Sequence, residues 1–246
     1  MMRTANPALN ENTFEAAGVV RSSEAMTIQG TVNKTGFALI LLLISAAWVW
    51  DQAMSGAGVP PLAWLLGAFG GFIVGLVTIF KKEWAPVTTP AYAVLEGLIL
   101  GAISSAFEKQ FPGIVVPAVA LTFGTLGGLL LAYTSRLIQP TENFKLGIAA
   151  ATLGICLVYV VNLVMGFFGK SIPLIHQGGP AGILFSLFIV VIAALNLVLD
   201  FDFIEQGSAQ GAPKYMEWYA AFGLLVTLVW LYMEMLRLLS KLRERR

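Results

Sequence analysis

Seven long apolar runs, separated by short polar connections, dominate this sequence. Each run is close to the 20 or so residues that an α-helix needs to cross about 30 Å of hydrocarbon. A single segment in lipid has to satisfy its own backbone hydrogen bonds, which favours a helix for every run. The sequence therefore predicts an all-α membrane protein with seven transmembrane helices, at residues 36–53, 61–80, 88–107, 113–134, 146–168, 181–205 and 214–238.

The composition agrees with a membrane location. Hydrophobic residues make up 57% of the chain and charged residues only 12%, whereas a soluble domain carries about 25% charged residues. The formal net charge of +1 gives no reason to expect a nucleic-acid partner. The single cysteine, Cys156, excludes an internal disulfide and a cysteine-based metal site. The lipid bilayer is thus the first partner that we predict.

The chain divides into a tail and a membrane domain. Residues 1–35 are polar, lack the apolar core of a cleavable signal peptide and predict a flexible cytoplasmic tail. Residues 36–242 predict the seven-helix transmembrane domain. Lys and Arg are concentrated in the connections that lie on the same face of the membrane as the N-terminus. Since such residues favour the cytoplasmic face, this predicts a multi-pass protein of the cytoplasmic (inner) membrane with its N-terminus in the cytoplasm. The basic C-terminus contradicts this orientation if all seven segments span, so its side stays open.

Small residues recur at every fourth position in three of the inner helices. This spacing lets helix backbones approach closely in lipid, where no hydrophobic force drives helices together. We expect a compact bundle. The small residues are Gly67, Gly71 and Gly75 in the second helix, Gly97, Gly101 and Ser105 in the third, and Ala120, Gly124, Gly128 and Ala132 in the fourth.

Acidic residues collect where the sixth helix ends. Asp200, Asp202 and Glu205 lie within six residues, and Glu217 opens the seventh helix. A carboxylate inside a membrane helix is expensive and marks a functional site by default. Because each helical residue advances about 100°, Asp200 shares a face with Asn196, while Asp202 and Glu205 lie nearly opposite and mark the interface.

The pair that the sequence favours is Asp200 with Glu217. Asp200 lies about 10 Å inside the end of the sixth helix, and Glu217 lies at a similar depth at the start of its antiparallel neighbour. Glu234 is about 25 Å further along the seventh helix, with Arg237 or Lys241 to balance its charge. Glu96, well inside the third helix, is a weaker candidate for proton sensing or ion binding.

Two carboxylates held together in a low dielectric cannot both ionise cheaply, so they share a proton. Sharing a proton ties the two helices together, whereas the ionised pair repels and can admit a cation. Oxygen ligands alone suit a hard cation such as calcium, for which Asp200 and Glu217 are the candidate ligands. The competing interpretation places these acids at the interface, neutral or paired with Lys214. No cofactor is predicted beyond transient calcium.

At these residues the sequence resembles the Bax inhibitor-1 family of membrane proteins, also called the transmembrane Bax inhibitor motif family. The resemblance covers about residues 30–242 and rests on the seven helices, the acidic end of the sixth (200–202) and a Tyr-x-acid opening of the seventh (215–217). The stretches 26–34 and 212–219 look like a bacterial branch of the family.

The resemblance implies a central seventh helix surrounded by the first six, and a proton-sensitive calcium leak. It also implies a sensor made of one carboxylate on the sixth helix, which Asp200 matches, and one on the seventh. Glu217 fits the second position best, but Glu234 also has a Tyr-x-acid setting, so this assignment stays open. Family members can use a basic residue of the second helix to restrain the acidic pair, for which Lys81 and Lys82 are the nearest candidates.

Three functions follow from these residues. The leading hypothesis is a pH-sensitive calcium leak channel or cation/proton exchanger that moves calcium or protons. The alternative is a non-conducting membrane regulator that binds a membrane protease or another membrane complex. An intramembrane aspartyl hydrolase ranks last, because no Pro or Gly that could unwind the helix precedes Asp200; we therefore expect no enzyme. The oligomeric state stays open.

Overall fold

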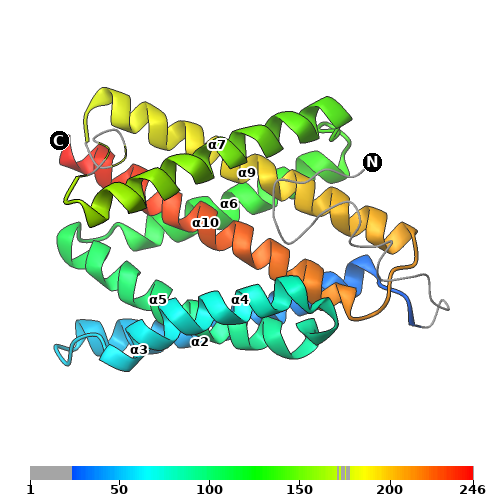
Figure 1. Ribbon diagram of the computed structural model, residues 1–246, viewed down its shortest axis with the longest axis horizontal. Coiled ribbons are helices and arrows are strands. Elements are labelled where there is room, and N and C mark those ends of the chain that lie inside the picture. Colours follow the sequence, from blue (N-terminus) through cyan, green and yellow to red (C-terminus); the bar gives the residue numbers. More distant parts are fainter. Residues whose placement is uncertain (1–23, 171, 173–174, 176–177, 246) are drawn as a thin grey trace. The chain divides into compact units, whose positions relative to one another are not determined.

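A computed structural model describes residues 24–170, 172, 175 and 178–245. The predicted flexibility of residues 1–23 concerns a stretch outside this range. Within the described residues, seven helical segments are long and apolar enough to cross a membrane. The chain is an all-α, multi-pass membrane protein. Figure 1 shows the helices in chain order. The second span consists of three consecutive pieces: α3 (Pro61–Leu65), a π-helical turn η2 (Leu66–Gly70) and α4 (Gly71–Phe80). A short 3₁₀ turn, η3 (Lys82–Trp84), comes directly before α5, and the other helices are α2 (Ile28–Met54), α5 (Ala85–Gln110), α6 (Val115–Thr134), α7 (Glu142–Phe167), α9 (Pro180–Ala209) and α10 (Met216–Glu244).

The first span begins earlier than expected. Thr27 is the N-cap of α2, and its hydroxyl oxygen accepts a hydrogen bond from the Gly30 amide at 3.0 Å. An N-cap threonine satisfies one of the otherwise unpaired amides at a helix start. Thr31 and Thr35, one turn apart, are buried in the same helix. Residues 28–35 therefore belong to α2 rather than to the polar tail that their composition predicted.

The described chain forms two compact units. The unit that we call the α2–α5 unit takes its described residues from Pro7–Pro112 and Phe203–Val226, and the α6–α7 unit takes them from Gly113–Asp202 and Thr227–Arg246. The long helix α10 contributes its N-terminal part to the first unit and its C-terminal part to the second. The predicted arrangement, in which the first six helices surround the seventh, stays a prediction.

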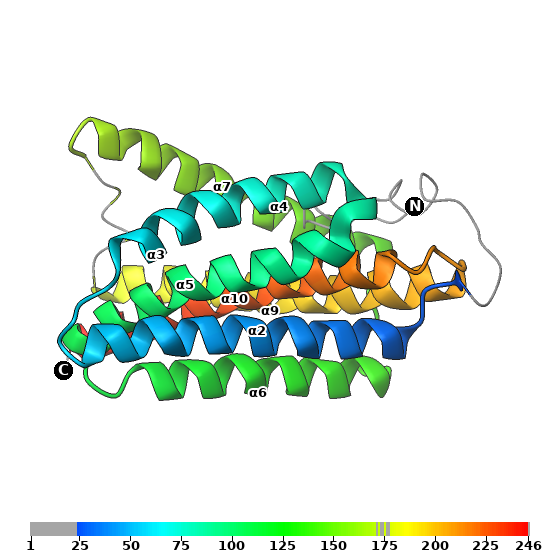
Figure 2. The same cartoon turned by 90° about the horizontal axis from the view of Figure 1, so that it is seen from below.

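In the α2–α5 unit, α5 lies between α2 and α4 (Figure 2). Glycines make both contacts close: a Cβ on Gly97 or Gly101 of α5 would collide with the backbone of α2. A Cβ on Gly67 would come within 2.8 Å of the Ile99 amide nitrogen of α5. The small residues of the second and third spans thus pack helix against helix, as predicted. The prediction for the fourth span is wrong, since no described residue lies within 4 Å of a Cβ built on Gly124 or Gly128.

In the α6–α7 unit, polar bonds set the helix directions. Asn196 of α9 donates to Thr152 of α7 at 2.9 Å, while Asp202 of α9 pairs with Lys145 at the start of α7. The two helices are therefore antiparallel. Apolar side chains fill the core between them, including Ile148, Ile155, Ile189, Ile192 and Leu199, with Trp230 of α10 packed against this cluster.

Candidate functional site

Asp200 lies in a part of α9 that is buried all round. The residues from Leu197 to Phe201 cover a full helical turn, and each is at most 8% exposed. Asp202 and Glu205, which helical spacing places nearly opposite Asp200, are half-buried. Asn196 is 2% exposed and donates its amide hydrogens to the Thr152 hydroxyl and to the backbone oxygen of Ile192. Asn196 and Asp200 therefore place polar groups in a predominantly apolar part of the helix.

Asp202 does not lie at a bare interface. Its carboxylate accepts from the Lys145 ammonium at 2.7 Å, and the Lys145 side chain is only 6% exposed. Lys145 also lies 3.6 Å from Glu142 in the first turn of its own helix. Asp202 thus forms an ion pair between α7 and α9.

Glu217 lies in the first turn of α10 and is completely buried. Its Oε1 accepts from the Thr27 amide at 2.9 Å and from the Thr27 hydroxyl at 2.8 Å, and it lies 2.8 Å from the Lys214 ammonium. Its Oε2 pairs with the Lys34 ammonium of α2. We call these four residues the Glu217 cluster. Two cations and a capping threonine therefore surround one buried carboxylate.

The local backbone brings these residues together. Ala25 forms a β-bridge with Pro213, and the Met26 amide donates to the Ala212 carbonyl at 2.6 Å. This joins the start of α2 to the connection that precedes α10. Gly30 faces the carboxylate so closely that a Cβ would overlap the Glu217 side chain. The absence of a side chain at position 30 therefore makes room for the buried acid.

Tyr215, in the connection just before α10, does not add a titratable group near neutral pH. Burial raises the pKa of its hydroxyl above the ordinary value of 10, and the nearby Glu83 raises the pKa further. A phenol with a raised pKa keeps its proton throughout the physiological range.

The basic partner of Glu217 differs from the expected one. The resemblance pointed to Lys81 or Lys82, but Lys34 of α2 holds the carboxylate, and the Lys82 ammonium lies 5.8 Å from the centre of the Tyr219 ring. The expectation that Lys214 pairs with these acids is confirmed for Glu217. Hydropathy, which starts the helix at residue 36, does not reveal the roles of Thr27 and Lys34. Threonine is a favoured N-cap residue, so Thr27 is the sequence signal that could have revealed the earlier start.

Glu234 belongs to a second buried cluster, in the α6–α7 unit. Its Oε1 accepts from the Tyr159 hydroxyl of α7 at 2.8 Å and from the Arg237 guanidinium one turn further along α10. Arg237 also donates to the Tyr159 oxygen and stacks over its ring at 5.2 Å. We call these three residues the Glu234 cluster. The expected balance of Glu234 by Arg237 is confirmed, while the Lys241 ammonium donates to Ser186 and Gly182 of α9.

Within this unit Glu234 lies far from Asp200. Tyr159, which binds Glu234, is fourteen residues beyond Lys145, which binds Asp202, so the two levels are about 21 Å apart along α7. Asp200 is only two residues from Asp202. Glu234 is therefore not a direct partner of Asp200 within this unit. Asp200 and Glu217 fall in different units, and their pairing remains a prediction.

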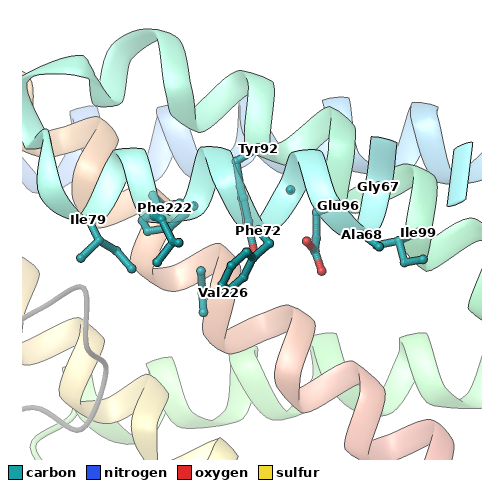
Figure 3. A pocket seen from close by; sticks show the side chains of 12 residues that line it. Gly67, Ala68, Phe72, Ile79, Tyr92, Glu96, Ile99, Phe222 and Val226 are labelled. Carbon is teal, nitrogen blue, oxygen red and sulfur yellow. The ribbon is translucent and has the colours of Figure 1, made fainter. Parts of the chain in front are cut away.

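Glu96 lies near the middle of α5 and is half-buried. Tyr92 precedes it by one turn in the same helix. Both side chains line a cavity of the α2–α5 unit (Figure 3). Glu96 is thus separate from the Glu217 cluster at the start of α10.

A calcium ion would find few protein ligands at these acids. Among the residues that the structure describes, no three His, Cys, Asp or Glu side chains come together as a metal site. Calcium prefers six to eight oxygens. The assignment of Asp200 and Glu217 as calcium ligands stays a prediction.

Seven apolar helices, with completely buried carboxylates on the sixth and on the seventh, define a multi-pass membrane protein. Residues 6–244 match the model of the family described as Bax inhibitor 1 like, and the chain belongs to that family. Searches of the curated proteins and of the solved structures gave no match.

Proposed function

We propose that this protein is a pH-sensitive calcium leak channel or cation/proton exchanger of the cytoplasmic membrane, with its N-terminus in the cytoplasm. The observation that supports this most directly is the complete burial of Asp200 inside a membrane-spanning helix. An ionisable group at such a position costs about 2.5–3.5 kcal/mol on insertion scales, so it persists where it serves a function. The proposal is for transport rather than for catalysis.

In this mechanism Asp200 and Glu217 form the carboxylate pair that responds to protons. When the pair shares a proton, it holds the sixth and seventh helices together; when both acids ionise, they repel and attract a cation. The Lys34 ammonium, which pairs with Glu217, is the built-in cation of the closed state. An entering calcium ion therefore has to displace Lys34 from the carboxylate.

The test is calcium flux into proteoliposomes between pH 6 and pH 8. Deprotonation of the pair opens the path, so we expect the native protein to pass more calcium at pH 8 than at pH 6. Asp200→Asn and Glu217→Gln should each remove this pH dependence. Glu83→Gln, which makes the same change at an exposed residue, is the matched control and should retain it.

Each result has a definite meaning. Loss of the pH dependence with Asp200→Asn but not with Glu217→Gln would retain the channel and reject Glu217 as the partner. A folded native protein that passes no calcium at any pH would reject conduction altogether. Circular dichroism and size-exclusion chromatography establish that each variant is folded.

One observation favours the alternative function, a non-conducting membrane regulator that binds a membrane protease or another membrane complex. Both oxygens of Glu217 are already bonded within the protein, to Thr27, Lys34 and Lys214. A carboxylate used in this way can serve structure alone. If flux is absent while Glu217→Gln lowers thermal stability, the regulatory function replaces the channel.

A further inference from the structure

A cavity of about 360 Å³ lies in the α2–α5 unit, between α4, α5 and the N-terminal part of α10. This volume is within the range of small-molecule sites in proteins. Figure 3 shows Tyr92 and Glu96 of α5 reaching into it, with Phe222 and Val226 contributed by α10. The cavity therefore combines an open apolar wall with two polar groups from a single helix.

The lining of the cavity is almost entirely apolar. Of its twelve lining residues, Glu96 is the only one that carries a charged group, and none is Lys or Arg. Tyr92 supplies a hydroxyl group but no positive charge. A buried carboxylate is stabilised when an opposite charge reaches it. In contrast to Glu217, Glu96 has no cationic side chain beside it among the residues that line the cavity.

Glycines keep the space around Glu96 open. A Cβ on Gly71 would come 3.2 Å from the Glu96 Oε2, which is tighter than an ordinary contact. The π-helical turn Leu66–Gly70 ends directly before Gly71 and contributes Gly67 and Ala68 to the lining. Single π-helical turns inside α-helices occur frequently at functional sites. The wall opposite Glu96 is thus irregular: its small residues leave room beside the carboxylate, while Phe72 and Leu76 supply apolar surface.

The depth of Glu96 restricts the ligand. Glu96 lies eleven residues after Ala85 and fourteen before Gln110, which places it about 16 and 21 Å from the two ends of α5. Lipid headgroups lie at the surfaces of a hydrocarbon layer about 30 Å thick. The amine of a lipid headgroup therefore does not reach this carboxylate, whereas a small molecule dissolved in the bilayer does.

We propose that this cavity binds a small hydrophobic ammonium compound, with its apolar body against Phe72, Phe222 and Val226 and its protonated amine on the Glu96 carboxylate. The amine supplies the positive charge that the lining lacks, and the Tyr92 hydroxyl is the second polar group that lines the cavity. This site is distinct from the Asp200 and Glu217 pair, and it does not depend on whether the protein conducts calcium.

The experiment measures saturation binding of tritium-labelled 4-phenylbutylamine to the full chain in nanodiscs, with empty nanodiscs subtracted. Unlabelled 4-phenylbutan-1-ol, which has the same apolar body and no charge, competes. A hydrogen bond to a charged group contributes about 1.5–3 kcal/mol. We therefore expect the amine to bind at least about tenfold more tightly than the alcohol at pH 7.5.

Three variants identify the site. Glu96→Gln should reduce the preference for the amine over the alcohol to near unity, and the matched control Glu83→Gln should leave it unchanged. Val226→Trp fills the cavity without touching the carboxylate and should weaken amine and alcohol alike. If Glu96→Gln does not fold, Val226→Trp decides alone.

Two results would overturn the proposal. One is equal affinity of the native protein for the amine and the alcohol, which would make the cavity merely apolar. The other is amine binding that survives in Glu96→Gln or in Val226→Trp, which would place the amine elsewhere on the protein.

Discussion

The two carboxylates buried on α10 differ in how many of their oxygens are bonded. In the Glu217 cluster both oxygens are bonded, one to Lys34 and the other to Thr27 and Lys214. In the Glu234 cluster, Oε1 accepts from Tyr159 and Arg237, while Oε2 has no hydrogen-bond partner among the described residues. Both acids are at most 2% exposed. Burial alone therefore does not say how a membrane carboxylate is used; its remaining hydrogen-bonding capacity does.

This difference bears on the proposed mechanism. Glu217 has to release a lysine before it can receive another cation, whereas Glu234 can accept one more donor without losing a partner. The cations also differ in origin, since Lys34 comes from α2 and Arg237 from one turn along α10 itself. We expect the Glu217 cluster to join α2 to α10 strongly and the Glu234 cluster to contribute less.

Removing the long-range cation should have the largest effect. Breaking a buried ion pair by deleting one partner typically costs 3–5 kcal/mol, because a charge is left uncompensated. Lys34→Met leaves Oε2 of Glu217 without its lysine, while Thr27 and Lys214 still bind Oε1. We therefore expect a loss at the low end of this range, about 3 kcal/mol in the free energy of unfolding, measured by SDS titration in micelles. The double variant Lys34→Met/Glu217→Gln removes the charge as well and should recover part of this loss. A single variant as stable as the native protein would contradict the importance of the pair.

Gly30→Ala tests how tightly the Glu217 cluster is packed, because it adds a methyl group next to the carboxylate. A Cβ on Gly30 overlaps the Glu217 carboxylate, while nothing lies within 4 Å of a Cβ on Gly36, six residues further along the same helix. Overpacking typically costs 1–3 kcal/mol, whereas Gly→Ala at an open helical position stabilises by up to about 1 kcal/mol. Gly30→Ala should therefore lower the melting temperature and Gly36→Ala should not. Equal shifts for the two variants would show that the carboxylate has room to move.

Tyr159→Phe probes the Glu234 cluster. It removes the hydroxyl that donates to Oε1 and leaves Arg237 in place. Loss of one hydrogen bond to a buried charged group costs about 1–2 kcal/mol when another donor remains. We expect a loss in this range by SDS titration, smaller than that of Lys34→Met. A loss as large as that of Lys34→Met would erase the contrast between the clusters.

Much of this arrangement could be predicted from the sequence, because it depends on spacing within one helix. The seven spans follow from hydropathy, and the separation of Asp200 from Asp202 and Glu205 around α9 follows from helical spacing. The partners Arg237 and Lys214 are each three residues from the acid they bind. Arg237 shares a face of α10 with Glu234, and Lys214 lies in the connection directly before α10, so both pairs are local in the sequence.

Contacts between distant helices could not be predicted in this way. Lys34 is 183 residues from Glu217 and Tyr159 is 75 residues from Glu234, so neither pair has a local signature. The start of α2 was also misplaced, because Thr, Asn and Lys lower its hydropathy below that of a membrane segment. Those residues are polar because the end of the helix holds a buried acid. Hydropathy therefore fails at the place where the first span forms the Glu217 cluster.

The smallest expected effect concerns the second lysine of the Glu217 cluster. Lys214 lies 2.8 Å from Glu217, but its side chain is 52% exposed, against 19% for Lys34. Water screens an exposed pair, and such pairs contribute about 0–1 kcal/mol. Lys214→Met should therefore cost less than about 1 kcal/mol, and this cost should shrink further at high salt, where exposed charges are screened. Both lysines place an ammonium group beside the Glu217 carboxylate, and they differ in how exposed their side chains are. Comparing the unfolding free energies of Lys34→Met and Lys214→Met at low and high salt therefore shows how much the burial of the lysine contributes to the strength of the pair. If Lys214→Met costs as much as Lys34→Met, the position of the lysine on α2 is not what makes the pair strong, and both cations restrain Glu217 equally.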